Sequence, residues 1–320
     1  MIGAGVGLVV SSLADMVVST LSTTGGGPVS TPLLRGIWRS LLWLHRRRTS
    51  HGLLKRAAPV LIVLVIALWL SGLWAGWTLV FSAHTGAVVD ATTEAPASFG
   101  DRVYFTGFSL FTLGTGDVVG GHAGWRIAST LCSFTGLFVV TLSLTYVMSV
   151  ISAATEKRQI ALLVHGVGAD GVSLLRSAWD GRDLSGLDDL LTEVGPKLAL
   201  HAERHLAYPV LHFFHAAERR AALAPAVVAV DDALRIAGAL SPEVRPGAVA
   251  TRMARAAIEA LTERAGVDDG GAPPPIPDIT KLREMGLPLA APEVEAAFSD
   301  RARARLGSYL CSQGWPREAT

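Results

Sequence analysis

The sequence predicts an all-α membrane protein, and its composition and two uncharged runs carry that prediction. Half of the 320 residues are hydrophobic and the mean hydropathy is +0.40, which is high for a soluble protein. The runs 57–81 and 127–155 contain no charged residue. At about 1.5 Å per residue, a helix over the first run is long enough to cross a hydrocarbon core of about 30 Å. A buried helix pair in a soluble protein is the alternative, but uncharged runs this long are rare there.

The charges that flank the runs predict an orientation. Residues 16–56 contain no Asp or Glu and seven Lys or Arg, whereas the loop 82–124 carries four acidic residues against Arg102 alone. Positively charged flanks stay on the cytoplasmic side of a membrane. We therefore expect a multi-pass protein of the cell membrane with 33–56 in the cytoplasm, the loop outside, and everything from Glu156 onward in the cytoplasm.

The N-terminal region divides into two parts. Residues 1–32 read as an apolar helix over 1–21, interrupted only by Asp15, followed by a Gly/Ser/Thr/Pro linker. This helix either crosses the membrane or lies in its interface, and the sequence leaves both open. Residues 33–56 alternate Trp and Leu with Arg, which is typical of a basic amphipathic helix on the inner leaflet. A basic flank that only fixes the topology would have the same composition.

A short helix is predicted over 98–111, between the two uncharged runs. Aromatic residues recur there at spacings of three and four, and Ser98 or Asp101 could cap its start. The segment is too short to span, so we expect a re-entrant helix buried among others. It leads into the sequence Thr112-Leu113-Gly114-Thr115-Gly116-Asp117, whose closely spaced glycines suit an extended backbone with left-handed residues.

This hexapeptide resembles the signature of the potassium channel pore-domain family, Thr-Val-Gly-Tyr-Gly-Asp, at four of six positions. The resemblance covers about residues 57–155. It implies a tetrameric pore-loop channel with a helical cytoplasmic C-terminal domain. The pore domain would comprise an outer helix 57–81, a pore helix 98–111, a filter 112–117 and an inner helix 125–155. The partners would be K⁺ or Na⁺, the lipid bilayer and three further copies of the chain, with no organic cofactor, no nucleic acid and no catalysis.

The resemblance also assigns roles to individual residues. It implies that K⁺ binds in the filter at Thr112, Leu113, Gly114, Thr115 and Gly116. Asp117 would brace the outer mouth with help from Tyr104. On the inner helix, Gly136 would be a gating hinge, or a site of close packing. The polar residues that follow would line a wet cavity, or bond back to their own helix: Thr141, Thr145 and Ser149.

The residue at position 115 departs from the family. A threonine cannot fill the space of the family's tyrosine, although Phe105 and Phe108 could fill it instead. If they do, we expect a rigid filter that prefers potassium. If they do not, sodium passes as well. A membrane sensor or scaffold whose loop conducts nothing is a further alternative.

The region 156–320 is predicted to be mostly helical, with helices near 186–207, 210–222, 226–240, 247–265 and 292–310. Residues 166–171 match the pattern GxGxxG, which suggests a nucleotide-binding protein or a simple glycine-rich turn. Nucleotide binding would require a strand over 160–165 and an acidic residue on a second strand, where the sequence reads as helix.

Four histidines form the remaining candidate site. They are spaced i,i+4 and i,i+3, which can present two imidazoles on one helix face to a metal ion or to protons. Ordinary packing is the simpler alternative. The four residues are His201, His205, His212 and His215.

Overall fold

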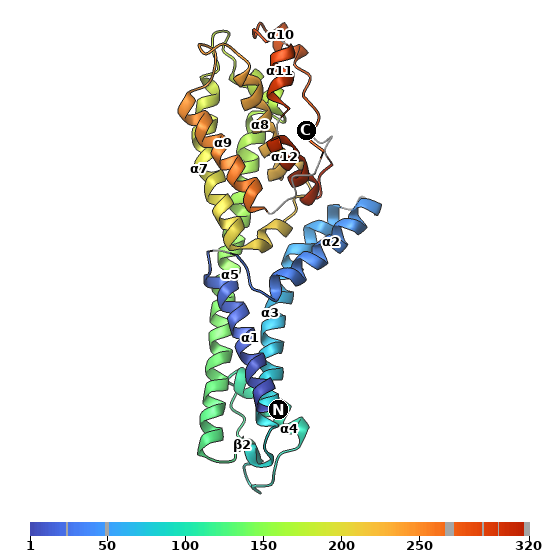
Figure 1. Ribbon diagram of the computed structural model, residues 1–320. Coiled ribbons are helices and arrows are strands. Elements are labelled where there is room, and N and C mark those ends of the chain that lie inside the picture. The colour runs from blue at the N-terminus through green and yellow to red at the C-terminus, as the bar shows by residue number, and fades with distance from the viewer. Residues whose placement is uncertain (24, 49–50, 266–271, 290, 300, 317–320) are drawn as a thin grey trace. The chain divides into compact units, whose positions relative to one another are not determined.

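The computed structural model describes residues 1–23, 25–48, 51–265, 272–289, 291–299 and 301–316, and it is largely helical (Figure 1). The chain divides into two compact units. The first unit comprises Met1–Leu34 and Pro59–Ser149, and the second comprises Arg35–Ala58 and Val150–Thr320. Three helices contribute residues to both units: α2 (Ser30–Arg48), α3 (His51–Phe81) and α5 (Ala123–Val167).

Among the described residues, three helices are long and apolar enough to cross a membrane, which fits the predicted all-α membrane protein. They are α1 (Ile2–Leu21), α3 (His51–Phe81) and α5 (Ala123–Val167). The inner helix was predicted to end at residue 155, and that boundary is wrong. Charged residues end the apolar stretch without interrupting the helical backbone, so α5 continues through Glu156, Lys157 and Arg158.

Small residues bring α1 and α3 into close contact in the first unit. A methyl group added to Gly76 would lie 2.9 Å from the carbonyl oxygen of Gly5, and one added to Gly72 would meet the Ser12 hydroxyl. Gly72 and Gly76 are four residues apart, the spacing that lets two helix backbones approach in a membrane. Within this unit, α1 is therefore a packed helix of the bundle.

Asp15, the charged residue within α1, is buried, and both of its carboxylate oxygens accept hydrogen bonds. One carboxylate oxygen accepts hydrogen bonds from the backbone N–H groups of Val29 (2.6 Å) and Ser30 (3.1 Å), at the start of α2 (Ser30–Arg48). The other oxygen accepts one from the indole N–H of Trp69 at 2.8 Å. Asp15 thus satisfies backbone donors that the beginning of a helix leaves unpaired.

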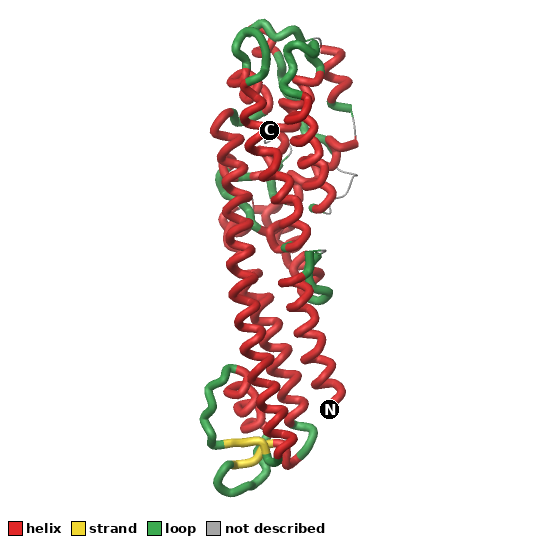
Figure 2. Tube along the Cα trace, turned by 90° about the vertical axis from the view of Figure 1, so that its left-hand side faces the viewer, coloured by secondary structure: helices red, strands yellow, loops and turns green. Residues whose placement is uncertain are grey.

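The loop between α3 and α5 contains a small two-stranded antiparallel sheet that the sequence pattern did not predict. After a short 3₁₀ turn (Thr85–Ala87), strand β1 (Val88–Asp90) pairs antiparallel with β2 (Val118–Gly120), with Val89 opposite Val119. Figure 2 shows the two strands in yellow. The re-entrant helix α4 (Phe99–Leu110) lies between them in sequence. Residues 112–117 are called the filter segment below. The strand pair holds the end of this segment next to the start of the loop.

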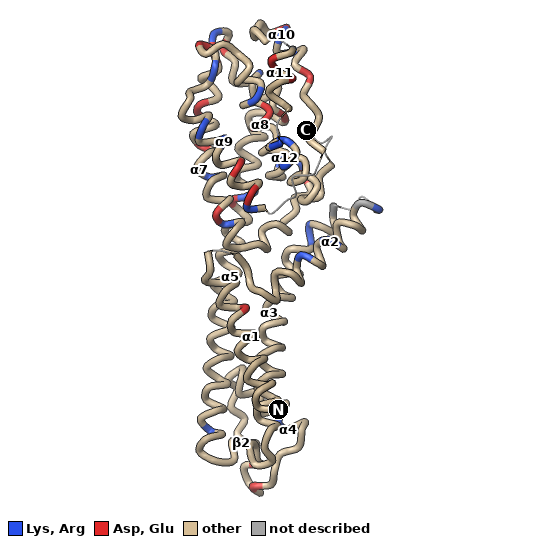
Figure 3. The backbone as a smooth tube through the Cα atoms, viewed as in Figure 1, with Lys and Arg blue, Asp and Glu red and all other residues tan. Residues whose placement is uncertain are grey.

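The second unit is a helical bundle around α8 (Leu223–Gly238), whose residues are buried up to Ala237. It also contains α6 (Gly171–Ala178), α7 (Gly186–Ala207), α9 (Ala248–Arg264), α10 (Thr280–Glu284), α11 (Ala291–Ala297) and α12 (Arg301–Ser312). Most charged residues of the chain belong to this unit, while the apolar helices of the first unit carry few (Figure 3). The predicted helices 186–207, 226–240 and 247–265 are present within a few residues.

Two helix predictions in this unit are wrong. The segment 210–222 forms short 3₁₀ turns, Pro209–Phe213 and Arg219–Ala221, and the carbonyls of Leu211 and Phe214 also accept hydrogen bonds from a lysine of α5. The predicted helix 292–310 is split into α11 and α12.

The GxGxxG segment does not form the start of a nucleotide-binding unit. Residues 160–165 belong to α5, so the required strand is a helix. The Asp170 carboxylate accepts a hydrogen bond from the backbone N–H of Ser173 (2.7 Å) at the start of α6. Because a negative side chain already occupies this helix start, a phosphate would be repelled there.

Candidate functional site

The re-entrant helix α4 starts where the sequence predicts. The Ser98 hydroxyl accepts a hydrogen bond from the Asp101 backbone N–H at 3.2 Å, and the Asp101 carboxylate accepts one from the Ser98 backbone N–H at 3.1 Å. These reciprocal bonds form a capping box. The helix ends at Leu110, so its C-terminal end, with its partial negative charge, directly precedes the filter segment.

The filter segment has an alternating backbone. Thr112, Gly114 and Gly116 have positive φ angles of 57°, 63° and 80°, while Leu113 and Thr115 between them do not. Alternation between left-handed and ordinary conformations turns successive peptide planes so that their carbonyls can face one side. Glycine adopts the left-handed conformation freely, but a β-branched threonine does so only at a cost, and such strain is concentrated at functional sites.

Asp117 is held at the end of this segment mainly by Thr115. The Thr115 hydroxyl donates a hydrogen bond to the Asp117 carboxylate at 2.6 Å, and the Val118 backbone N–H donates another at 3.1 Å. The Thr115 hydrogen bond is the largest cause that lowers the pKa of Asp117 below its ordinary value, and the Tyr104 hydroxyl is the smallest contributor. Thr115, the residue that departs from the family signature, therefore makes the main hydrogen bond that holds Asp117.

A cavity of about 560 Å³ lies between the filter segment and the first turns of α5. Its lining includes Thr112, Gly114 and Gly116 on one side and Ser129 and Ser133 on the other. Phe105 and Phe108 also line it, and their rings pack edge to face with centroids 5.3 Å apart. In the single chain, these two rings border the space behind the filter segment and do not fill it.

Gly136 packs against the end of α4. A methyl group added to Gly136 would lie only 1.9 Å from the carbonyl oxygen of Leu110, the last residue of that helix. The helix α5 continues without interruption past this position. Close packing, one of the two interpretations of this glycine, accounts for its identity in this conformation.

Replacing Gly136 with alanine is expected to lower the stability of the first unit. The added methyl group overlaps a backbone carbonyl that cannot rotate away, and overpacking of this kind typically costs about 1–3 kcal/mol. The measurement is the melting temperature of the full chain in detergent. Gly166→Ala is the matched control in the same helix, because a methyl group there meets no atom within 4 Å. Equal melting temperatures for both variants would contradict the packing role.

The polar residues below Gly136 form hydrogen bonds with their own helix. The Thr141 hydroxyl donates to the carbonyl of Leu137 at 2.9 Å, and the Thr145 hydroxyl donates to that of Thr141 at 3.2 Å. Both threonines are exposed in the single chain and Ser149 is partly exposed. The lone pairs of these hydroxyls stay available to water.

The four histidines do not form a metal site. The rings of His201, His205 and His212 follow one another at centroid distances of 6.0 and 5.5 Å, nearly perpendicular, while His215 is 2.8 Å from the Gln313 carbonyl through its Nδ1. In the residues that the structure describes, no group of three or more His, Cys, Asp or Glu side chains could hold a metal ion. In this structure the i,i+4 pair packs edge to face within the core, an arrangement that does not present both imidazoles to one ion.

Burial controls the charge of these histidines. It is the largest cause that lowers the pKa of His201 and of His212 to about 3, and it places the pKa of His205 well below its usual value. The nearby Lys157 adds a repulsive contribution to each. At neutral pH the three rings are therefore uncharged.

Lys157 is the prominent residue that sequence reasoning missed. It is buried, and its ammonium group donates hydrogen bonds to the carbonyls of Leu211 (3.2 Å) and Phe214 (3.0 Å) and to the side-chain oxygen of Gln313 (2.7 Å). The sequence shows it only as one of three consecutive charged residues after an apolar run. Its acceptors lie more than 50 residues away along the chain, so no local pattern reveals them.

Comparison with known proteins gives a family for the part of the chain that contains this site. Residues 61–153 match the family model described as "Ion channel". The chain is 32% identical over 291 residues to the uncharacterized membrane protein YdjJ of Bacillus subtilis (strain 168), covering 89% of this chain and 84% of that protein. No solved structure matches significantly.

Proposed function

Because this chain belongs to the two-helix ion channel family, we propose that four copies of it form a potassium-selective channel. The alternating backbone at Thr112, Gly114 and Gly116 is the observation that carries the proposal. It occurs directly after a re-entrant helix and between two helices that can cross a membrane. A row of carbonyls with a common direction is what a dehydrated cation requires in place of water.

One chain supplies one such row, so a closed coordination ring needs several copies around an axis. Cyclic symmetry places the same carbonyl of each copy at the same height. Residues 112–116 then provide stacked rings of ligands, and the Thr112 hydroxyl provides the innermost one. The negative end of α4 points its partial charge at the same axis and favours a cation there.

The remaining parts of the channel follow from the charge distribution. The acidic outer loop attracts cations to the mouth, and Asp117 braces the filter there. Thr141, Thr145 and Ser149 are proposed to face a water-filled cavity below the filter. The basic segment 33–56 and the second unit are proposed to be cytoplasmic, in keeping with the positive-inside rule.

One observation favours a non-selective sodium/potassium channel as the second candidate. The cavity behind the filter segment is bordered but not filled by Phe105 and Phe108. A filter without firm backing can widen, and a wider site no longer distinguishes the two ions by the fit of its carbonyls. In an assembled channel, selectivity therefore depends on whether a neighbouring copy occupies this space.

Ion flux into liposomes separates the candidates. We expect the reconstituted full chain to carry a potassium flux down a potassium gradient, with little flux when sodium replaces potassium. Equal fluxes of the two ions would support the non-selective channel. Flux no greater than in protein-free liposomes would refute conduction and leave a membrane sensor or scaffold.

A further inference from the structure

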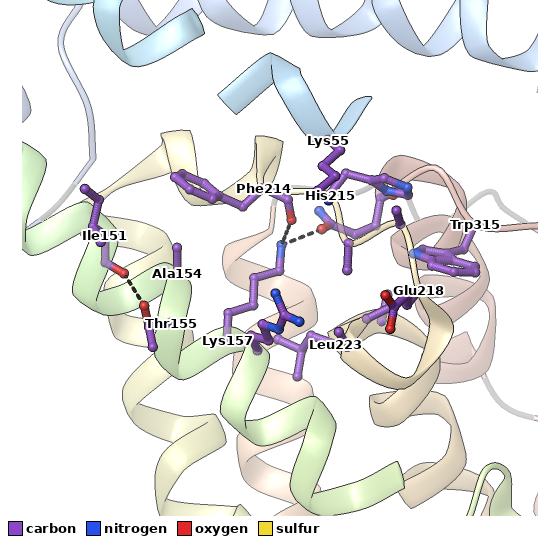
Figure 4. Close-up of a pocket in the computed structure, with 17 residues that line it drawn as sticks. Lys55, Ile151, Ala154, Thr155, Lys157, Phe214, His215, Glu218, Leu223 and Trp315 are labelled. Atoms are coloured by element: carbon purple, nitrogen blue, oxygen red, sulfur yellow. Dashed lines mark hydrogen bonds between the residues drawn. The ribbon is translucent and has the colours of Figure 1, made fainter. Parts of the chain in front are cut away.

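A second cavity, of about 460 Å³, lies in the second unit. Its walls come from Lys55 of α3, residues 151–158 of α5, the segment 214–224 and residues 313–315 near the end of the chain. Figure 4 shows the side chains that surround it. The volume falls in the range of small-molecule pockets, about 300–1,000 Å³.

Two cations at this cavity use none of their side-chain donors in a hydrogen bond or salt bridge with a described residue. Lys55 and Arg158 are both exposed lining residues. Among the described residues, neither has a hydrogen-bond or salt-bridge partner. Their donors are therefore available to a ligand.

A third basic residue, Lys157, is buried in the wall of the cavity. Lys157 lines the cavity, and its ammonium protons are all used by the carbonyls of Leu211 and Phe214 and by Gln313. Figure 4 shows the bonds to Phe214 and Gln313. These bonds leave its ammonium group without a proton to offer a ligand. Burial lowers the pKa of Lys157 to about 7, so this group carries only part of a positive charge near neutral pH.

The carboxylate among the described lining residues is already paired. Glu218 accepts a hydrogen bond from Arg220 at 2.7 Å, and this bond is the largest cause that lowers the pKa of Glu218. Lys55 and Arg158 lower that pKa further, which shows that both lie close enough to act on an anion at this place. Because Glu218 is paired with Arg220, Lys55 and Arg158 leave an excess of two positive charges at the cavity.

Most of the remaining lining is apolar, with Thr155, His215 and Gln313 as its polar members. The apolar members include Ile151, Ala154, Phe214, Leu223 and Trp315. A ligand that matches both the cationic and the apolar parts of the lining carries a doubly negative group and an apolar body. A phosphate monoester carries a charge of about −1.5 to −2 near neutral pH and three acceptor oxygens.

We propose that this cavity binds the phosphate monoester of an organic molecule, with Lys55 and Arg158 donating to the phosphate and the apolar wall contacting the organic part. Arginine suits this role because its guanidinium can donate two parallel hydrogen bonds to phosphate. Lys55 lies two residues before the uncharged run 57–81, and Arg158 lies three residues after the run 127–155. The phosphate could therefore belong to a lipid headgroup or to a soluble ester.

Titration calorimetry of the full chain with phenyl phosphate tests the proposal, using protein in nanodiscs of phosphatidylcholine. We expect saturable binding, and we expect Lys55→Gln and Arg158→Gln each to weaken it about tenfold, the loss typical of one charged hydrogen bond. Arg182→Gln is the matched control, since this exposed arginine lies outside the cavity. It should bind as the wild-type chain does.

A second set of nanodiscs distinguishes the sources of the phosphate. If binding of phenyl phosphate is lost in nanodiscs that contain phosphatidic acid and retained in those that contain oleate, the site takes a lipid headgroup. If binding persists in both, it takes a soluble ester. Absence of binding in phosphatidylcholine alone, or equal binding by all three variants, would overturn the proposal. None of these readouts depends on ion conduction.

Discussion

Gly114→Ala is expected to abolish the ion flux of reconstituted liposomes while the chain still assembles. Gly114 has a φ angle of +63°, in the left-handed region, where an L-residue with a side chain costs about 1–2 kcal/mol more than glycine. Four copies around one axis multiply this cost to about 4–8 kcal/mol, enough to favour a different backbone conformation in the whole ring. The carbonyl that should face the ion then turns away.

The control for this variant must add the same methyl group without strain. Gly7→Ala does so, because Gly7 lies in α1 and a methyl group there meets no atom within 4 Å. Potassium flux and the size of the detergent-solubilised assembly are measured for both variants. Wild-type flux in Gly114→Ala would show that this segment is not the path of the ion. Loss of flux in both variants would show that methyl groups disturb the membrane helices generally.

Acidification is expected to unfold the second unit. The pKa values of His201 and His212 are lowered to about 3 and that of His205 is lowered well below its usual value. The folded state therefore binds fewer protons than the unfolded state, whose histidines titrate near 6.5. The stability from these groups is fully present above about pH 6.5 and decreases toward pH 3, by about 1.4 kcal/mol per histidine for each pH unit.

Thermal melting of the full chain between about pH 7 and pH 4 checks this expectation. His201→Phe removes one of the three buried titrating groups, so its melting temperature should depend less steeply on pH than that of the wild-type chain. His122→Gln, at an exposed position of the outer loop, is the control and should leave the pH dependence unchanged. A wild-type melting temperature that stays constant across this range would contradict the buried, neutral state of the cluster.

Much of the first unit could be predicted because its signals are local. Uncharged runs predict spanning helices through their length and composition alone. Ser98 and Asp101 predict the start of α4 because a capping box lies within four consecutive residues. Gly114 and Gly116 predict left-handed backbone because glycine adopts it without strain, and both residues have positive φ angles.

Other features could not be predicted because their causes lie far apart in the sequence. The strands β1 and β2 have three residues each, too few to show an alternating pattern. Trp69 is separated by 54 residues from Asp15, the carboxylate that accepts its hydrogen bond. The sequence also cannot distinguish a hinge from a packing site at Gly136, because both require the absence of a side chain.

The end of α5 and the segment 210–222 show two further limits. Charged residues mark where an apolar stretch ends, but α5 continues beyond them because lysine, glutamate and arginine are good helix formers. In 210–222 the local periodicity suits a helix, yet the segment forms short 3₁₀ turns, and the carbonyls of Leu211 and Phe214 accept hydrogen bonds from Lys157. The local pattern does not show such a tertiary contact.

The hydrogen bonds of Asp15 have a consequence for how the chain enters the bilayer. A lone carboxylate on an emerging α1 would face lipid with no donor to satisfy it, which is costly. Its partners, Trp69 and the backbone at Val29 and Ser30, are synthesised later. If α1 crosses the bilayer, we therefore expect it to insert stably only together with α3.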